Sequence, residues 1–563
     1  MISLQIGYTI LIRTFIIFGF LLLSAISAEA QADLLPLDHP ATLQLERLYR
    51  AGAIPTFPAE HLPISRRSAL KFLEEAAADE ELSELARKQA VWTMVELRAD
   101  IGEEKRTVVI PLSSDQEEFF DDPFSSRPFT GIAWYDTASR STIFLDPVLD
   151  GEVRYDEERN STAAIFQGGV RFRGTALNHI GFSGRATNGT IVGNDTVVRV
   201  DPRYGRSFKF GVIQAQRDID FGSAHLRADF DGLFAEIGRE QVRLGLGGKR
   251  TLLFGADLPS NTDYFRLGGQ IGKVSFTHLH ASLLDDTTGR AVGIGAEIPS
   301  KYLATHLLSV GPFAGLRFSV GEAVIYSGRQ LEIGYVNPLN FIKSQEHYLR
   351  DRDNSMMYAA LSASLPEHIF LEGEFLLDDL IFSNIGKGFW GNKTAWRLSA
   401  DVVGLFHPML DFGLSYTRLE PYVYSHFKTL NAYVHDGSGM AAAGLDPNSS
   451  LFESKVTLWP TSNFRGEVTF GIGRHGANVV ENGQVVRNVG GDIRRTFDST
   501  SNEKVEFLDG TSEKSLSVDV RLDYEVLRNI YLRSHLFSRS IDREGSGIEK
   551  QVQLWLGISV GAR

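Results

Sequence analysis

The sequence is notable first for what it lacks. Its 563 residues include no cysteine, which excludes disulfide bonds and thiolate chemistry. After the N-terminal segment no stretch reaches the roughly 18 consecutive apolar residues of a transmembrane helix, so any passage through a membrane must use strands. Lys and Arg (57) are fewer than Asp and Glu (70), which gives a net charge of −13. Because phosphate recognition needs clustered basic side chains, nucleic acid is excluded as a partner.

The first 30 residues have the organisation of a secretory signal peptide. Arg13 precedes an apolar run from Phe15 to Leu23, and small residues follow up to Ala30. The alternative is an uncleaved membrane anchor, but the run is short for a span and ends in a cleavage-like A-x-A pattern. We therefore predict cleavage before Gln31 and export from the cytoplasm.

Residues 31–112 show a helical pattern that the rest of the chain lacks. DHPATLQLERLYRAG has apolar residues at helical spacing and Gly52 placed to end the helix. PISRRSALKFLEEAAA offers Ser65 as an N-cap, and DEELSELARKQAVWTMVELRADIG begins acidic and turns basic, as the helix dipole prefers. We predict three short helices in a periplasmic segment, followed by an acidic linker at 113–126.

From residue 127 to 563 the pattern changes to strand alternation, which SLSVDVRLDYEV (515–526) illustrates. Its apolar side chains fall on one parity: Leu516, Val518, Val520, Leu522 and Tyr524. Its charged side chains Asp519, Arg521 and Asp523 fall on the other. Successive side chains of a strand point to opposite faces. One face must therefore meet an apolar environment and the other a polar one.

The length of these segments favours a membrane barrel over a soluble sandwich. They run for about eight to ten residues, close to the roughly 9–11 of a transmembrane strand and longer than the five or six typical of soluble sheets. We predict an all-β, transmembrane antiparallel β-barrel over 127–563, with 16 to 18 strands and a hydrated lumen. The longest connections are 188–205, 327–355, 383–394, 421–450 and 475–512. They are expected to face outside, although one could fold inward as a plug.

Motifs for catalysis and metal binding are weak. SALK (68–71) matches S-x-x-K without the accompanying K-T-G element, and GIGRHG (471–476) continues a strand instead of opening a helix. His278 and His280 share one strand face and could chelate a metal, but no third ligand lies nearby, so lumen- or surface-facing histidines are favoured. We predict no catalytic residues, no metal site and no cofactor.

Two connections combine aromatic residues with Asn, Asp and Gly, as saccharide-binding surfaces do. They are SNIGKGFWGNK and LEPYVYSHFKTLNAYVHDGSG. The candidate polysaccharide-binding residues are Phe389, Trp390, Tyr422, Tyr424, Tyr433 and His435. The alternative is an aromatic girdle at the membrane boundary, where Tyr422 and Tyr424 could lie.

Several segments, in order, resemble the Wzi-like capsule assembly family of outer-membrane proteins. They include IGREQVRLGLGGKRTLLFGADLP (237–259), GEAVIYSGRQLEIGYVNPLNFI (321–342) and YVHDGSGMAAAGLDPNSS (433–450). The resemblance implies a barrel of about 18 strands with a periplasmic helical element. It also implies a lectin-like role in holding capsular or exopolysaccharide at the cell surface, without catalysis.

These observations together predict a non-enzymatic protein of a Gram-negative-type outer membrane that assembles or attaches surface polysaccharide. Its expected partners are outer-membrane lipid, capsular or exopolysaccharide and, as a further candidate, periplasmic export machinery. A porin-like channel for solutes or polysaccharide export is the first alternative. An outer-membrane lipid or glycan hydrolase, with a catalytic pair assembled from distant strands, is the second.

Overall fold

A computed structural model of the protein describes most of the chain. The described ranges are 31–80, 82–98, 107–109, 131–136, 138–199, 217–230, 232–255, 260–285, 299–313, 315–366 and 368–561, with residues 201, 204 and 258. The predicted signal peptide and the predicted linker at 113–126 lie outside these residues.

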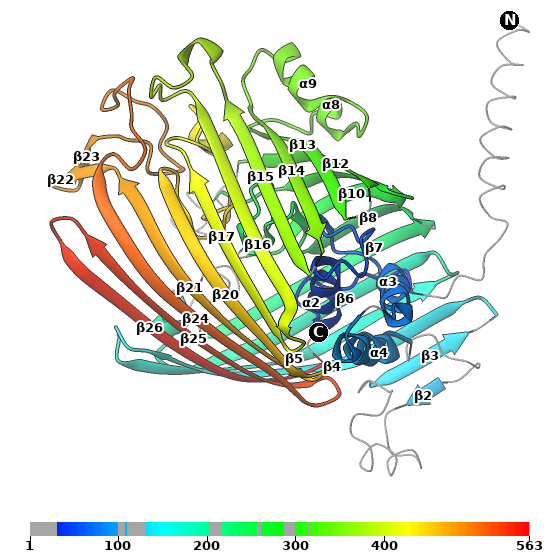
Figure 1. Ribbon diagram of the computed structural model, residues 1–563. Coiled ribbons are helices and arrows are strands. Elements are labelled where there is room, and N and C mark those ends of the chain that lie inside the picture. Colours follow the sequence, from blue (N-terminus) through cyan, green and yellow to red (C-terminus); the bar gives the residue numbers. More distant parts are fainter. Residues whose placement is uncertain are drawn as a thin grey trace, which may run out of the picture.

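Eighteen long strands form a closed antiparallel β-barrel (Figure 1), which confirms the predicted fold class. They are β4 (Ser141–Asp156), β5 (Ser161–Ala176), β6 (Ile180–Gly193), β7 (Asp218–Phe230), β8 (Leu233–Glu240), β10 (Thr262–Ile271), β11 (Val274–Ser282), β12 (Lys301–Phe313), β13 (Leu316–Ser327), β14 (Asn354–Leu365), β15 (Ile369–Asp379), β16 (Lys393–His407), β17 (Leu410–Leu419), β20 (Ser449–Thr461), β21 (Phe464–Ala477), β24 (Thr511–Leu527), β25 (Ile530–Arg543) and β26 (Gly547–Val560). Each pairs with the next, and β26 pairs with β4 to close the ring.

One end of the barrel carries short turns and the other carries the long connections; we call them the turn end and the loop end. Two further strands, β2 (Thr107–Val109) and β3 (Ile132–Asp136), pair beside the first residues of β4 at the turn end. The loop-end connections contain α6 (Thr196–Arg199), α8 (Ile333–Val336), α9 (Ile342–Tyr348), η3 (Phe382–Asn384), β22 (Val479–Glu481) and β23 (Gln484–Arg487).

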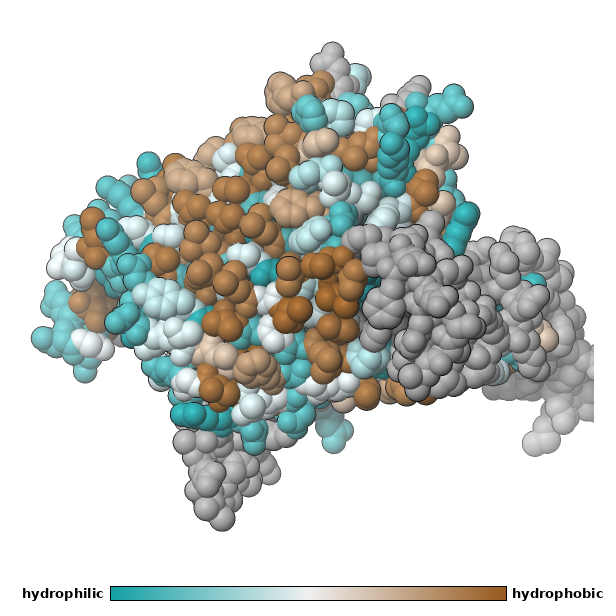
Figure 2. Space-filling view, turned by 90° about the horizontal axis from the view of Figure 1, so that it is seen from below, coloured by the Kyte–Doolittle hydropathy of each residue, from teal (hydrophilic) through white to brown (hydrophobic). Residues whose placement is uncertain are grey.

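The wall has an apolar outer face and a polar inner face, as the alternation in β24 predicts. Leu516, Leu522 and Tyr524 are exposed on the outside. Asp519 is half-buried on the inside, where it pairs with Arg521 at 3.0 Å. Figure 2 shows one side of the molecule on which hydrophobic side chains gather over the wall and hydrophilic ones border them.

The predicted N-terminal helices are present as α2 (Pro40–Arg50), α3 (Arg66–Ala78) and α4 (Glu84–Arg98). Ser65 caps α3, because its hydroxyl accepts a hydrogen bond from the Ser68 amide. The three helices pack on one another and on Phe370 of β15, at the turn end (Figure 1). Among the described residues, no helix is both long enough and apolar enough to cross a membrane.

Two loop-end connections fold inward and fill part of the lumen. The β8–β10 connection contains β9 (Arg243–Leu244) and η2 (Gly248–Arg250). The β17–β20 connection contains η4 (Thr429–Asn431), β18 (Val434–His435) and β19 (Ser438–Gly439). Their apolar side chains form one buried core with inward-facing residues of β12 to β17. One of the five long connections, which include 421–450, was expected to be able to fold inward as a plug, but the inward course of the β8–β10 connection was not anticipated.

Candidate functional site

Two of the predicted polysaccharide-binding residues, Tyr424 and Tyr433, are buried inside the barrel. Their rings stack with centroids 5.4 Å apart. The Tyr424 hydroxyl donates to the carbonyl of Leu252 at 2.9 Å, and the Tyr433 hydroxyl donates to that of Leu253 at 2.5 Å. Burial raises the pKa of both phenols, which keeps them protonated as donors. In this structure the two side chains tie one inward connection to the other.

His435 has a similar internal position. Its Nε2 lies 3.0 Å from the Ser260 hydroxyl, and its Nδ1 accepts a hydrogen bond from the Leu284 amide at 3.2 Å. Since Nδ1 accepts, a neutral ring carries its proton on Nε2 and donates to Ser260. The imidazole is buried, so it stabilises the inward connection from within.

Phe389 and Trp390 lie at the loop end and remain half-buried. Trp390 stacks on Phe497 with ring centroids 4.3 Å apart, and its amide donates to the carbonyl of Glu503 at 3.1 Å. Phe389 lies 5.7 Å from the Trp390 ring and forms an isolated bridge with Lys504. The β15–β16 and β21–β24 connections therefore meet at these aromatic side chains.

Tyr422 forms the buried base of this group. Its ring lies 5.8 Å from Trp390, edge to face, and its hydroxyl donates to the carbonyl of Asn488 at 2.9 Å. We call Phe389, Trp390, Tyr422 and Phe497 the aromatic cluster. It joins three connections that are separated in sequence and leaves three of its four rings partly exposed.

Polar groups of both signs surround the aromatic cluster. Lys387, Glu503 and Lys504 are exposed, and Asp498 pairs with Arg495 at 2.6 Å. Burial raises the pKa of Asp498, but hydrogen bonds from Thr500 and the contact with Arg495 outweigh it and lower the pKa, so this carboxylate is charged at neutral pH. Apolar ring faces beside fixed polar groups can pack on the C–H faces of a sugar and hydrogen-bond its hydroxyls.

Phe497 was not among the predicted binding residues, although its connection, 475–512, was identified as long. The signal was present: Phe497 is a single aromatic residue within RRTFDST, surrounded by charged and hydroxyl side chains. An isolated aromatic in such a polar stretch has no local core to join, which makes it a candidate for packing on another segment or on a ligand.

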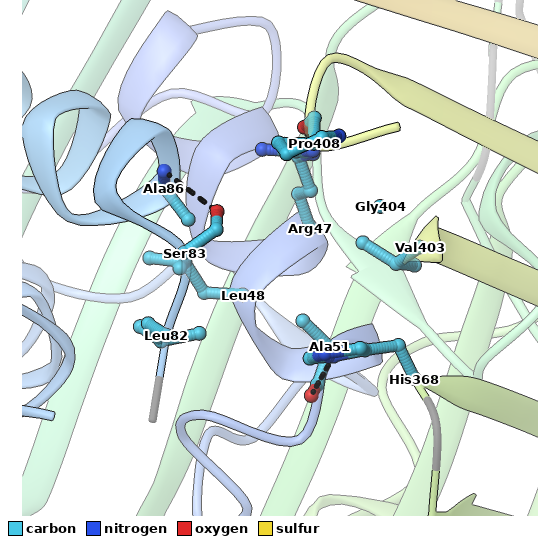
Figure 3. A pocket seen from close by; sticks show the side chains of 10 residues that line it. All are labelled: Arg47, Leu48, Ala51, Leu82, Ser83, Ala86, His368, Val403, Gly404 and Pro408. Atoms are coloured by element: carbon cyan, nitrogen blue, oxygen red, sulfur yellow. Dashed lines mark hydrogen bonds between the residues drawn. The ribbon is translucent and has the colours of Figure 1, made fainter. Parts of the chain in front are cut away.

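A small pocket lies at the opposite, turn end, between the helices and the barrel. Figure 3 shows Arg47 and Leu48 of α2 and its C-cap Ala51 across from His368 and Pro408 of the barrel turns. The Arg47 guanidinium donates to Asp411 at 2.7 Å and to the carbonyl of Pro408 at 2.8 Å. His368 approaches the carbonyl of Ala51 at 3.4 Å. The polar groups of this pocket thus hold the helices against the barrel.

The fold and these sites define a class of protein: a transmembrane-type β-barrel of 18 strands, occupied by helices at one end and by inward connections from the other. No family model matches the sequence, and no curated protein matches it.

Among solved structures, the chain has a fold similar to that of Wzi from Escherichia coli, described as an outer-membrane protein involved in group 1 capsule assembly and a carbohydrate-binding β-barrel. The two share 11% identity over 94% of this chain and 99% of Wzi, with a TM-score of 0.57. The resemblance to Wzi-like proteins is therefore confirmed for the fold.

Weaker similarity extends to two outer-membrane proteins of Pseudomonas aeruginosa. OprD shares 12% identity over 74% of this chain and 92% of OprD, with a TM-score of 0.42. OccD3 (OpdP) shares 10% identity over 75% of this chain and 92% of OccD3, with a TM-score of 0.43.

Proposed function

We propose that the protein is a non-catalytic outer-membrane barrel that attaches or assembles capsular or exopolysaccharide at the cell surface. The observation that carries this proposal is the occupation of the lumen from both ends, because it leaves the loop-end surface as the accessible polar face. The apolar outer wall supports placement in a membrane, and the fold shared with Wzi supports a carbohydrate ligand. The helices at the turn end would then lie on the periplasmic side.

Binding would use many weak contacts along a repeating polymer. Phe389, Trp390 and Phe497 would pack on sugar rings, and the charged groups around them would bind hydroxyl or carboxylate substituents. Tyr422, Tyr424, Tyr433 and His435 would act from below by fixing the connections that carry this surface. Because each chain segment offers repeated epitopes, retention would not require one tight site.

The first test is deletion of the gene in its native host. We expect cell-associated polysaccharide to fall while total synthesis stays unchanged, and an unchanged surface level would contradict the proposal. Trp390→Ala should reproduce part of this loss and reduce sedimentation of purified protein with the polymer. Phe382→Ala is the matched control, since Phe382 is exposed on the same connection but lies outside the aromatic cluster.

A channel remains the second candidate, because one part of the lumen wall is less covered. The inward side chains Asp519, Arg521 and Asp523 of β24 are only half-buried, as expected beside water. Purified protein in planar bilayers distinguishes the two functions: the anchor should be closed or nearly so, whereas a pore should conduct ohmically. The absence of catalysis is tested separately, by turnover on panels of lipid and glycan substrates.

A further inference from the structure

The outer wall of the barrel changes from apolar to polar side chains towards the loop end of β11, β12 and β13. His278, His306 and Glu322 point outward, because the residues next to them on each strand, Thr277 and Leu307 among them, face the lumen. On an open barrel wall such positions would meet lipid. Here the two histidines are buried and Glu322 is half-buried.

The same strands keep an ordinary apolar exterior closer to the turn end. Leu308 of β12 and Phe318 and Val320 of β13 are exposed on the outside. Glu322 follows Val320 by two residues on the same face. The boundary between lipid-compatible wall and polar wall therefore falls between these two side chains.

The polar part of the wall is covered by the β13–β14 connection, residues 328–353, which we call the outer flap. The Glu322 carboxylate accepts hydrogen bonds from the amides of Ile342 and Lys343, both at 3.0 Å. The Tyr326 hydroxyl accepts from the Glu332 amide at 3.3 Å, and its ring lies 5.2 Å from that of Tyr335. The flap, with α8 and α9, is thus fixed to the outside of β13 and β14 near the loop end (Figure 1).

The outer flap exposes five large apolar side chains, together with polar ones such as Asn337, His347 and Asp351. Its large exposed side chains are Ile333 (77% exposed), Leu339 (86%), Phe341 (73%) and Tyr348 (82%), with Leu331 beside them. Water would be an unfavourable environment for so many large apolar side chains on one short segment. Tyr335 and Ile342 of the same flap are buried against the wall, whereas the described residues leave the exposed apolar set largely uncovered.

We propose that the outer flap lies at the edge of the membrane and inserts these side chains among the acyl chains of the outer leaflet. The occupant is lipid because the flap is attached to the outside of the wall, directly beyond the apolar band that includes Phe318 and Val320. An amphipathic segment in this position buries its apolar face at the boundary between headgroups and acyl chains. This inference rests on the membrane placement contained in the proposed function, and it adds a second contact with lipid besides the strands.

Because the chain contains no cysteine, single introduced cysteines can be spin-labelled without removing native ones. Leu339→Cys and Phe341→Cys report on the outer flap. Leu398→Cys, exposed on the outside of β16, is the control for the lipid-facing wall, and Val480→Cys, exposed on β22, is the control for a water-facing connection. All four proteins are reconstituted in phosphatidylcholine vesicles, and collision with oxygen is compared with collision with a water-soluble nickel chelate.

The labels at 339 and 341 are expected to resemble the label at 398, with oxygen favoured over nickel, and to differ from the label at 480. Nickel-favoured collision at both flap positions, with oxygen favoured at 398, would overturn the flap inference and leave membrane placement intact. Nickel-favoured collision at 398 as well would overturn both. Spin–spin broadening at 341 would identify a second copy of the chain as the occupant and would also overturn the inference.

Discussion

The two occupants of the barrel are held there by different forces. The N-terminal segment docks on Phe370 through apolar contacts and is also held by buried ion pairs: Arg317 pairs with buried Glu60, and Arg47 pairs with Asp411 at 2.7 Å. The inward connections from the loop end dock mainly through apolar contacts, with Leu252 and other buried side chains of the β8–β10 connection packed on the wall, and one ion pair, Arg250 with Glu453 at 2.9 Å, supports them. The lumen thus contains buried ion pairs around the N-terminal segment and a hydrophobic core around the inward connections.

This difference predicts different responses to perturbation. A buried charge is tolerated only while its partner is present, so each ion pair of the N-terminal segment fixes one docked position. Apolar packing is less directional, but it loses free energy whenever a cavity opens. The inward connections also exchange backbone hydrogen bonds, such as Ala442 to Thr251 at 2.8 Å. We call the apolar core formed by the inward connections and the wall the loop-end core. We expect it to open less often than the docked N-terminal segment does.

The largest effect is expected from Phe254→Ala in the loop-end core. Phe254 is fully buried, and truncating such a side chain costs about 4 kcal/mol of the free energy of unfolding. Urea titration of the detergent-solubilised protein measures this cost. Val480→Ala, at an exposed position, should change stability little; an equal loss in the two variants would contradict the assignment of Phe254 to a core.

Arg317→Met should release the N-terminal segment without unfolding the barrel. It leaves Glu60 buried without its partner, at a cost of about 3 kcal/mol to docking. Hydrogen exchange in α2 and α3 should accelerate while exchange in the strands stays slow. Adding Glu60→Gln should recover part of the protection, and if exchange rose equally throughout the barrel, the two occupants would not be separable.

Docking of the N-terminal segment should also weaken in mild acid. Burial lowers the pKa of His61 to about 3, although the nearby Glu60 opposes the shift. Between this value and the ordinary 6.5, the undocked state binds a proton that the docked state does not, so stability falls as pH falls. From pH 7.5 to 5 the loss should be about 2 kcal/mol.

Proteolysis of residues 31–98 at the two pH values measures this loss. His61→Gln is the matched variant, because its amide can still contact the hydroxyls of Thr277 and Ser309, which lie 2.9 and 2.8 Å from the imidazole nitrogens. Its cleavage should vary less with pH than that of the unchanged protein. Retention of the full pH response in this variant would assign the response to another group.

The smallest effect is expected from Ser65→Ala. Loss of the N-cap hydrogen bond to the Ser68 amide should cost α3 about 1 kcal/mol. Exchange should rise in the first turn of α3 and remain unchanged in the loop-end core. Ser65→Asp, which can cap in the same way, should behave nearly as the unchanged protein does.

The barrel wall could be predicted from sequence because each strand repeats one local rule. A strand between lipid and lumen must alternate, and the segment from Leu516 to Tyr524 does so without interruption. The helices were predictable for a similar reason, since Ser65 and Gly52 mark their ends locally. In both cases the signal lies within a few consecutive residues, so it can be read without knowing the contacts made by distant segments.

The course of the long connections could not be predicted in the same way. Tyr424 and Tyr433 lie among Asn, Asp and Gly whether the segment binds a sugar or folds into the lumen, because the deciding contacts with Leu252 and Leu253 are distant in sequence. The sequence therefore identified aromatic connections correctly without distinguishing an exposed surface from a buried one. Phe389 and Trp390 are half-buried at the loop end, and their predicted role in binding is still to be tested.

The position of the helices within the chain also constrains the order of assembly. Glu60 can form its ion pair only after Arg317, 257 residues later in the chain, has been placed in the sheet. Arg47 likewise depends on Asp411, which is 364 residues later. The short strand β1 (His61–Leu62) meanwhile pairs with β9 inside the lumen. Because β26 joins β4 only when the final strand arrives, the N-terminal segment and the β8–β10 connection can associate while the sheet is still open. The last hairpins would then close the ring around a centre that is already folded.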